Sequence, residues 1–274
     1  MPLKYGQRTL LMGVVNLTPD SFSKDGLLRV SRDSAAHARF AAKLIQRGAD
    51  IIDIGGESSR PGAVPVSAQE EIKRIIPTVR LLACKYSIPV SVDTYKPLVA
   101  RAALDAGASI INNIMGTKPD RGLLAMVRDY GASIVLMHMR GTPRTMHTKT
   151  RYKDIVADII KELRISIGIC LEMGIKKDRI IIDPGIGFAK TTRHNLEILD
   201  RLDEFKILRF PILVGTSRKS FIGQILGNDA DSRVWGTAAT VAVAIARGAD
   251  IVRVHDAGIM KQVSVMTDAI VRSK

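Results

Sequence analysis

The chain has 274 residues, of which 46% are hydrophobic and 25% are charged, and these ordinary proportions exclude a disordered or collagen-like protein. The 41 Lys and Arg residues outnumber the 27 Asp and Glu residues, and the net charge of +14 attracts nucleic acid, anionic lipid or small phosphorylated substrates. No segment approaches the roughly 18 apolar residues of a membrane span, and the first residues lack the apolar core of a secretory signal. We therefore expect a soluble, cytoplasmic protein.

The basic residues and the cysteines narrow the classes of partner. Lys and Arg are scattered along the chain, and the aromatic residues that stack on bases make up only 4% of it. We expect neither nucleic acid nor a membrane as a partner. Cys84 and Cys170 lie far apart in helix-like segments, so we expect two buried thiols rather than a disulfide or a zinc site.

Short apolar runs alternate with helix-like segments along the chain. We predict strands over residues 10–16, 50–55, 89–94, 109–114, 133–139, 179–183, 211–216 and 251–255. Helical periodicity between them covers, for example, residues 34–46, 67–86, 152–173 and 232–247. A Gly-Ala pair before a polar residue and two branched apolar residues begins at Gly48, Gly107, Gly131 and Gly248. Each copy is typical of a helix end, a tight turn and a buried strand.

This alternation predicts the fold class. Eight strands, each followed by a helix, indicate an α/β protein built as a (β/α)8 TIM barrel with a parallel sheet. A doubly wound open sheet is the alternative architecture. No Ser-, Gly- or Pro-rich linker divides the chain, so we predict a single domain over residues 1–274.

Nearly every predicted strand ends on a polar side chain. These residues are Asn16, Asp53 followed by Glu57, Asp93, Asn112, His138, Asp183, Lys219 just after the seventh strand, and Arg253 with His255. A single residue of this kind is usually a turn residue or a helix cap. A TIM barrel builds its active site at the carboxyl ends of its strands, so their recurrence predicts a site there.

The residue types fit one kind of ligand. A buried carboxylate such as Asp93 or Asp183 needs donors, and the adjacent N–H groups of a pterin or a guanine supply them. Asn112 adds both a donor and an acceptor. Arg253 and His255 stand two residues apart on one strand and therefore on one face, where both can reach an anion such as a diphosphate. Without Arg253, His255 would be interpreted as a strand histidine whose hydrogen bonds are all made within the protein and that has no role in binding.

Three segments rich in Gly, Pro and small polar residues are expected to form loops beside this site. They are residues 16–23, 55–62 and 215–220. The second carries Arg60 and has the composition of a mobile lid over a charged substrate. The third lacks the spacing of a nucleotide-binding P-loop, but Ser220 and the following helix start predict an anion site.

Six motifs in this order resemble the dihydropteroate synthases of folate biosynthesis. They cover residues 16–22, 55–62, 91–94, 183–188, 217–223 and 253–256, and the resemblance extends over nearly the whole chain. It implies a barrel enzyme that joins 6-hydroxymethyl-7,8-dihydropterin diphosphate to 4-aminobenzoate and releases diphosphate with Mg²⁺ present. The resemblance also implies a homodimer.

The same resemblance assigns residues to three subsites. For the pterin they are Asp93, Asn112, Asp183 and Lys219, and for the diphosphate Asn16, Arg60, Arg253 and His255. For 4-aminobenzoate they are Ser59, Pro61, Phe188, Lys219 and Ser220. The resemblance places Asn16 near the metal and makes Asp93, Lys219, Arg253 and His255 the catalytic residues. It implies a dissociative reaction in which the bond to diphosphate breaks first, and a pterin substrate that binds before the arylamine.

Three positions depart from the family pattern, and two other functions stay open. Ser59 replaces a usual Thr, Asn113 replaces a usual Asp, and Lys24 is an extra residue in the first loop.

A methyltransferase that carries a methyl group from methyltetrahydrofolate to a corrinoid would share the pterin carboxylate, but would not need residues 217–220 or the Arg253 and His255 pair. A basic nucleic-acid-binding protein, from a different class, would explain the net charge but not the strand-end residues.

Overall fold

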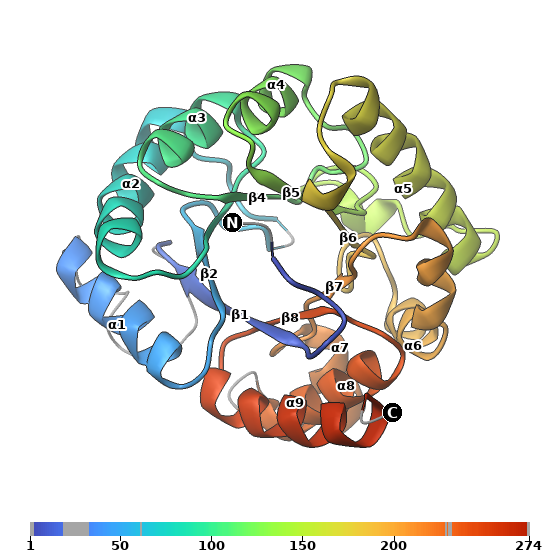
Figure 1. Ribbon diagram of the computed structural model, residues 1–274. Coiled ribbons are helices and arrows are strands. Elements are labelled where there is room, and N and C mark those ends of the chain that lie inside the picture. The colour runs from blue at the N-terminus through green and yellow to red at the C-terminus, as the bar shows by residue number, and fades with distance from the viewer. Residues whose placement is uncertain (1–2, 19–32, 61, 228, 230–231, 273–274) are drawn as a thin grey trace.

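Eight parallel strands form a ring in the computed structural model, which describes residues 3–18, 33–60, 62–227, 229 and 232–272 (Figure 1). The strands are β1 (Leu10–Asn16), β2 (Ile51–Gly55), β3 (Val90–Asp93), β4 (Ile110–Asn113), β5 (Ser133–Met137), β6 (Ile180–Asp183), β7 (Leu213–Val214) and β8 (Ile251–Val254). Their order is β6-β5-β4-β3-β2-β1-β8-β7, and a parallel bridge between Ile182 and Ile212 joins the two ends. The predicted barrel is therefore confirmed, and the open sheet is excluded.

Helices surround the ring (Figure 1). They are α1 (Ser34–Gln46), α2 (Ala68–Lys85), α3 (Pro97–Asp105), α4 (Arg121–Asp129), α5 (Ile155–Glu172), α6 (Thr192–Asp200), α7 (Ser220–Leu226), α8 (Val234–Ala246) and α9 (Ala257–Val271). The described residues contain no helix that is long and apolar enough to cross a bilayer. The predicted helices are confirmed to within three residues at each end.

Local sequence signals explain where these elements begin and end. The side chain of Ser67 accepts a hydrogen bond from the backbone of Glu70 and caps α2, and Asp154 caps α5 in the same way. Gly48 and Gly248 follow α1 and α8 with φ angles of 98° and 104°, a conformation that side chains with a Cβ rarely adopt. The repeated Gly-Ala pattern thus ends a helix and starts the next strand, as predicted.

The lower part of the barrel interior is filled by one apolar layer. It consists of Leu10, Met12, Ile51, Ile110, Val135, Ile181, Leu213 and Ile251, all buried. Side chains alternate along a strand, so the residue two positions later points inward again. On four strands that residue is polar, which places Asp53, Asn112, Asp183 and Arg253 directly above the apolar layer.

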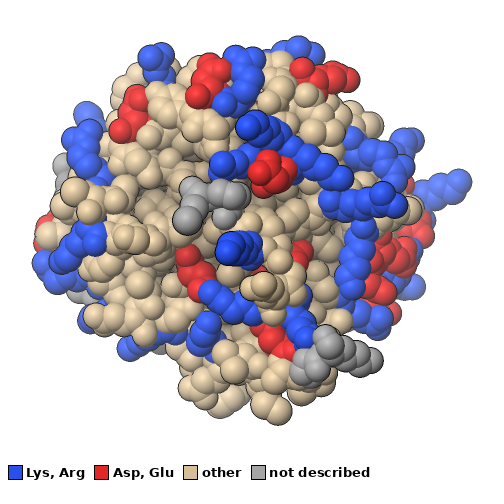
Figure 2. All heavy atoms as spheres, in the orientation of Figure 1, with Lys and Arg blue, Asp and Glu red and all other residues tan. Residues whose placement is uncertain are grey.

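The outer surface corrects one prediction and agrees with another. Cys170 is buried in α5 as predicted, but Cys84 is exposed on α2, so the prediction of two buried thiols was wrong for Cys84. The periodicity of α2 turns Ile75, Val79 and Leu82 toward the barrel and leaves Cys84 on the solvent side. Lys and Arg are spread over the face seen in Figure 2 and are interspersed with acidic residues, in line with the scattered basic residues of the sequence.

Candidate active site

A network of charged side chains crosses the barrel at the carboxyl ends of β2, β3, β4 and β8. Asp53 is 0% exposed, and its Oδ2 accepts hydrogen bonds from Arg253 Nε at 2.7 Å and from Asn112 Nδ2 at 3.1 Å. Arg253 Nη2 also donates to Asp93 Oδ2 at 3.2 Å. Burial raises the pKa of Asp93 to about 7; Arg253 opposes this rise, and the carboxylate of Asp53 adds to it. This network places two carboxylates, an amide and a guanidinium on one inner surface.

A second pair of opposite charges stands on the other side of the barrel. Asp183 ends β6, is buried, and accepts a hydrogen bond from the backbone N–H of Gly185 at 2.7 Å. Burial raises its pKa, against the positive charge of Lys219. Burial also lowers the pKa of Lys219 to about 8, against the charge of Asp183. We refer to Asp53, Asp93, Asn112, Asp183, Lys219 and Arg253 together as the inner polar ring.

Lys219 is held at the edge of this ring by the loop that follows β6. Its Nζ donates to the carbonyl oxygen of Ile186 and lies 4.6 Å from the centre of the Phe188 ring. A Cβ on Gly187 would come within 3.0 Å of the Lys219 side chain, and the φ of 83° at Gly187 also favours glycine. The loop therefore fits closely around the lysine, and the ammonium and the aromatic ring form one surface.

The end of β8 and the loop after β7 form a site suited to an anion. His255 Nδ1 lies 3.0 Å from the hydroxyl of Ser217, which also accepts the backbone N–H of His255. Burial lowers the pKa of His255 to about 3, and the charges of Arg253 and Arg218 add to this effect. The ring is therefore neutral near pH 7. In the tautomer in which the Ser217 hydroxyl donates to Nδ1, the imidazole proton is on Nε2, where it can be donated to a ligand.

Asn16 and Gly55 stand at paired positions where β1 and β2 end. A Cβ on Gly55 would lie 3.5 Å from Asn16 Oδ1 and 3.7 Å from the Asp93 Cβ. The missing side chain thus leaves room between the amide of Asn16 and the carboxylate of Asp93. Within the described residues, no group of three or more His, Cys, Asp or Glu side chains could hold a metal ion. Any divalent ion here would depend on a few oxygen ligands and on its substrate.

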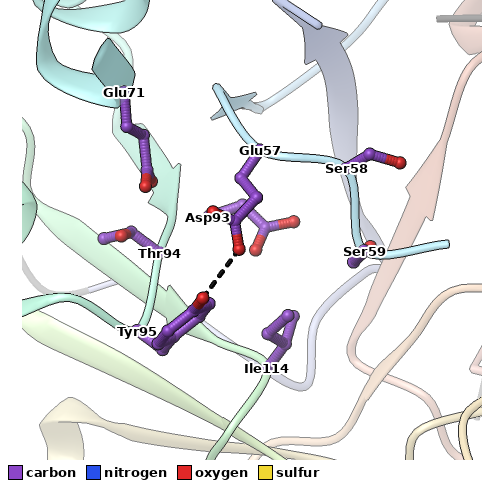
Figure 3. A pocket seen from close by; sticks show the side chains of 8 residues that line it. All are labelled: Glu57, Ser58, Ser59, Glu71, Asp93, Thr94, Tyr95 and Ile114. Carbon is purple, nitrogen blue, oxygen red and sulfur yellow. Dashed lines mark hydrogen bonds between the residues drawn. The ribbon is translucent and has the colours of Figure 1, made fainter. Parts of the chain in front are cut away.

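A hollow beside Asp93 is formed by the loop after β2 and the end of β3 (Figure 3). It is lined by Glu57, Ser58, Ser59, Glu71, Asp93, Thr94, Tyr95 and Ile114. Glu57 accepts hydrogen bonds from Tyr95 Oη at 2.7 Å, from Lys96 Nζ at 2.5 Å and from the backbone N–H of Val66 at 2.9 Å. These bonds fix the start of the loop, so Ser59 lines the same hollow as Asp93.

The structure brings most of the predicted site residues to one end of the barrel. Asn16, Asp93, Asn112, Asp183, Arg253 and His255 are on strand ends or directly after them, and Lys219 and Phe188 meet beside them. Ser220 is the first residue of α7 and is exposed, as is Arg60 in the loop after β2. Pro61 and Lys24 lie outside the described residues.

The predicted strand-end residue His138, and Asn113, which departs from the family pattern, face away from the barrel interior. His138 follows β5 and is 0% exposed, but its Nε2 lies 3.1 Å from Glu162 Oε2 on α5, outside the ring. Asn113 accepts the backbone N–H of Met115 at 2.9 Å and therefore stabilises a turn. Counting alternate residues from Val135, which points inward, would have identified the outward direction of His138.

The sequence did not identify Lys190, Lys96 and Ser217 as residues that contact the site. It also did not predict that Asp53 bonds to Arg253 and Asn112. Lys190 Nζ contacts His138 and the carbonyl oxygen of Phe188, while Lys96 Nζ bridges Glu57 and Glu71 at 2.5 and 2.6 Å. The contacts with His138, Glu57 and Glu71 join segments 25 to 52 residues apart in the chain. No motif or periodicity signals such contacts, because they depend on how the loops pack.

The comparisons with known proteins agree with this geometry. The family of pterin binding enzymes matches residues 12–255. The dihydropteroate synthase of Synechocystis sp. is 47% identical over 269 residues, which cover 98% of this chain and 92% of that protein. A dihydropteroate synthase from Clostridium difficile, solved in the presence of pteroic acid, gives a TM-score of 0.91 at 41% identity, covering 98% of this chain and 99% of that one. The Xanthomonas albilineans enzyme with 4-aminobenzoic acid gives a TM-score of 0.88 at 39% identity, covering 96% and 93%. In sequence and in fold, this chain belongs to the dihydropteroate synthase family.

Proposed function

We propose that the inner polar ring and its loops divide into three subsites for the reaction of this family. The chain is a transferase that joins 6-hydroxymethyl-7,8-dihydropterin diphosphate to 4-aminobenzoate and produces 7,8-dihydropteroate and diphosphate. The observation that carries the assignment of subsites is the buried Asp183 carboxylate beside Lys219, facing the network of Asp53, Asp93, Asn112 and Arg253. A small polar heterocycle in the space between these two groups would find hydrogen-bond acceptors and donors of the protein on both sides.

In the pterin subsite, Asp183 accepts the adjacent N–H groups of the pterin edge. A carboxylate is suited to this, since two parallel charge-assisted hydrogen bonds fix both position and orientation. Asn112 uses its Nδ2 to donate to Asp53, which leaves its Oδ1 directed at the ligand as an acceptor. Lys219 donates to the ring from the opposite side, and the 4-aminobenzoate complex and pteroic acid complex of the relatives support such neighbouring sites.

In the diphosphate subsite, Arg253 supplies a permanent positive charge and His255 a neutral Nε2–H donor, and the exposed Arg60 adds a further positive charge that acts on His255. Asn16 offers one amide oxygen, and Mg²⁺ in proteins commonly takes one or two protein oxygens, several waters and the substrate phosphates. The room left by Gly55 and this hard oxygen donor therefore fit Mg²⁺. When bound, Mg²⁺ would supply positive charge that stabilises the leaving diphosphate.

The proposed reaction requires little covalent catalysis by the protein. The C–O bond to the diphosphate breaks first, with the electron pair leaving on the diphosphate oxygen, and the nitrogen of 4-aminobenzoate then forms the new C–N bond and loses a proton. Arg253 and His255 stabilise the leaving group, and the carboxylate of Asp93 stabilises the cation spread over the dihydropterin. The charge of Arg253 favours the ionised form of Asp93 but leaves its pKa at about 7, and the positive charge that develops on the dihydropterin favours ionisation further.

The aminobenzoate subsite is formed by the loops. Phe188 offers its ring face beside Lys219, and Ser59 lines the hollow next to Asp93. Ser220 offers a hydroxyl to the aminobenzoate carboxylate, and Pro61 completes the set by the resemblance. The pterin substrate binds first, because its diphosphate draws Arg60 and the loop carrying Ser59 over the site.

We also infer a homodimer that forms through the outer face of α7, α8 and α9. Trp235 on α8 is 75% exposed, and Ile225 on α7 and Met266 and Ile270 on α9 are also exposed. Helix α8 packs against both α7 and α9, and the lower edge of the molecule in Figure 2 carries few charged side chains over α8 and α9. An apolar surface of this kind favours association with a second copy of the chain.

A single domain and a cytoplasmic location stay predictions. Both cysteines are free, which suits a reducing compartment.

The test is product formation by purified protein with Mg²⁺ and both substrates. We expect wild-type protein to form dihydropteroate and Lys219→Ala to lower kcat/KM by at least about 100-fold, since it removes a charged group that contacts substrate. Lys73→Ala, which removes an exposed lysine of α2, is the matched control and should match wild type. Folded wild-type protein that formed no dihydropteroate would contradict the proposal, and methyltetrahydrofolate would then be the next ligand to try.

A further inference from the structure

Behind the inner polar ring, a chain of three side chains connects helix α5 to the loop that follows β6. We propose that Lys190, His138 and Glu162 form a positioning relay, which holds this loop so that Phe188 and Lys219 face the second substrate. The relay touches neither substrate and acts through the loop. The inference rests on the proposed function, because Phe188 and Lys219 belong to the proposed aminobenzoate subsite.

His138 is the middle member of the relay. Its Nδ1 lies 3.0 Å from Lys190 Nζ, and its Nε2 lies 3.1 Å from Glu162 Oε2. A carboxylate only accepts, so the imidazole proton is on Nε2 and is donated to Glu162, and Nδ1 accepts from Lys190 Nζ. Burial lowers the pKa of Lys190 to about 7, and its Nζ can donate in both the charged and the neutral form. Burial keeps the imidazole neutral at pH 7, since it lowers the pKa of His138 to about 4, and the charge of Lys190 adds to this effect. Both ring nitrogens are thus engaged, and the orientation of the ring is fixed.

Lys190 connects this histidine to the backbone of the loop. Its Nζ also donates to the carbonyl oxygen of Phe188 at 2.9 Å. Tyr152 Oη donates to the next carbonyl, that of Ala189, at 3.0 Å. Ala189 has a φ of 52°, a left-handed conformation that is unfavourable for a residue other than glycine. The loop is therefore held in a conformation that needs outside contacts, and Lys190 supplies one of them.

The loop also lies directly on the strand that carries His138. A Cβ on Gly185 would come within 1.9 Å of the carbonyl oxygen of His138, so only glycine allows this approach. At the front of the same loop, Lys219 Nζ donates to the carbonyl oxygen of Ile186 and stacks on Phe188. A displacement of the loop would move both partners of Lys219 together. Small displacements of positioning groups have large effects on rate and affinity.

The structure offers a matched control for the relay. Glu162 and Asp158 are both on α5, with side chains 29% and 27% exposed, and both form ion pairs with Arg140 at 2.5 and 3.2 Å. Only Glu162 contacts His138. Replacing either residue by Ala removes a carboxylate from Arg140, but only Glu162→Ala breaks the relay.

The experiment compares wild type, Lys190→Met, Glu162→Ala, Asp158→Ala and the double variant Lys190→Met with Glu162→Ala. We expect Lys190→Met and Glu162→Ala to raise the KM for 4-aminobenzoate about tenfold with kcat within about threefold of wild type, and Asp158→Ala to stay within about twofold. The KM for the pterin substrate should rise less than that for 4-aminobenzoate, because Asp93, Asn112 and Asp183 are on strands and only Lys219 contacts the loop through its side chain. The double variant should also lose about tenfold rather than about 100-fold, because both changes break one relay.

Hydrogen exchange followed by mass spectrometry gives a readout that does not need activity. The amides of residues 185–190 should exchange at least about fivefold faster in Lys190→Met and in Glu162→Ala, and at the wild-type rate in Asp158→Ala. Glu162 is partly exposed, so its variant keeps the test available if Lys190→Met does not fold. The proposal is overturned if Glu162→Ala and Asp158→Ala behave alike, if the single losses multiply in the double variant, or if loop exchange stays at the wild-type rate. A wild-type protein without dihydropteroate formation would instead contradict the proposed function, and the exchange comparison would still decide on the relay.

Discussion

Two successive layers of side chains inside the barrel differ completely in character, although they come from the same strands. Ile51, Ile110, Ile181 and Ile251 belong to the buried apolar layer, and Asp53, Asn112, Asp183 and Arg253 follow two residues later on the same inner face. The lower layer stabilises the fold through buried apolar area. In the upper layer, burial disfavours the charged forms and raises the pKa of Asp93 and Asp183. The comparison teaches that a spacing of two residues on these four strands separates residues that support the fold from residues that bind ligand.

The largest effect on stability is expected where a charge of the upper layer loses its partner. Arg253→Met removes the ion pair to Asp53, which is 0% exposed and has no other charged partner within the described residues. An uncompensated buried charge lowers the free energy of unfolding by about 3–5 kcal/mol. Urea denaturation measures this loss, and the double variant Asp53→Asn with Arg253→Met should recover most of it. Unchanged stability of the single variant would show that the network does not hold the upper layer together.

A change in the lower layer should affect stability and leave the chemistry unchanged. Ile181→Ala deletes buried methyl groups two residues before Asp183 and should lower the free energy of unfolding by about 2–4 kcal/mol. At 25 °C the folded variant should keep kcat/KM within about twofold of wild type. Thermal denaturation and steady-state kinetics on one preparation check both statements. A normal melting temperature with a large loss of kcat/KM would contradict the division between the layers.

The smallest of the three effects concerns pH and the buried His138. Burial lowers its pKa to about 4, whereas the unfolded chain has the ordinary value near 6.5. Between these values the unfolded state binds a proton that the native state does not, so stability falls as the pH falls. From pH 6.0 to 4.5 the wild type should lose about 2 kcal/mol more than His138→Gln, as measured by urea denaturation at both values. Parallel losses in the two proteins would contradict the buried, neutral histidine.

The fold was predictable from the sequence because its signals are local. Gly48 and Gly248 mark helix ends, Ser67 caps a helix, and the apolar runs between them match the observed strands. The inner residues of the site, such as Asp183 and Arg253, were also predictable, because strand periodicity and the barrel rule place them at one end.

The contacts that orient the site were not predictable in this way. Lys190 reaches His138 across 52 residues, and Lys96 reaches Glu57 across 39, through loop conformations that no periodicity encodes. The exposure of Cys84 depends on which face of α2 meets the barrel, and it was predicted wrongly. Sequence patterns thus indicate which residues meet, whereas the way in which they are held depends on tertiary packing.

The measurement that tests the account most directly is the affinity of Asp183→Asn for 6-hydroxymethyl-7,8-dihydropterin diphosphate with Mg²⁺, determined by titration calorimetry. The substitution keeps the shape of the side chain but removes the charge that accepts the pterin N–H groups, so we predict a Kd about 100-fold above that of wild type. The melting temperature, measured on the same preparation, shows whether the variant is folded, because Lys219 loses its carboxylate partner. A wild-type Kd in this variant would contradict the claim that the layer above the apolar residues binds the pterin.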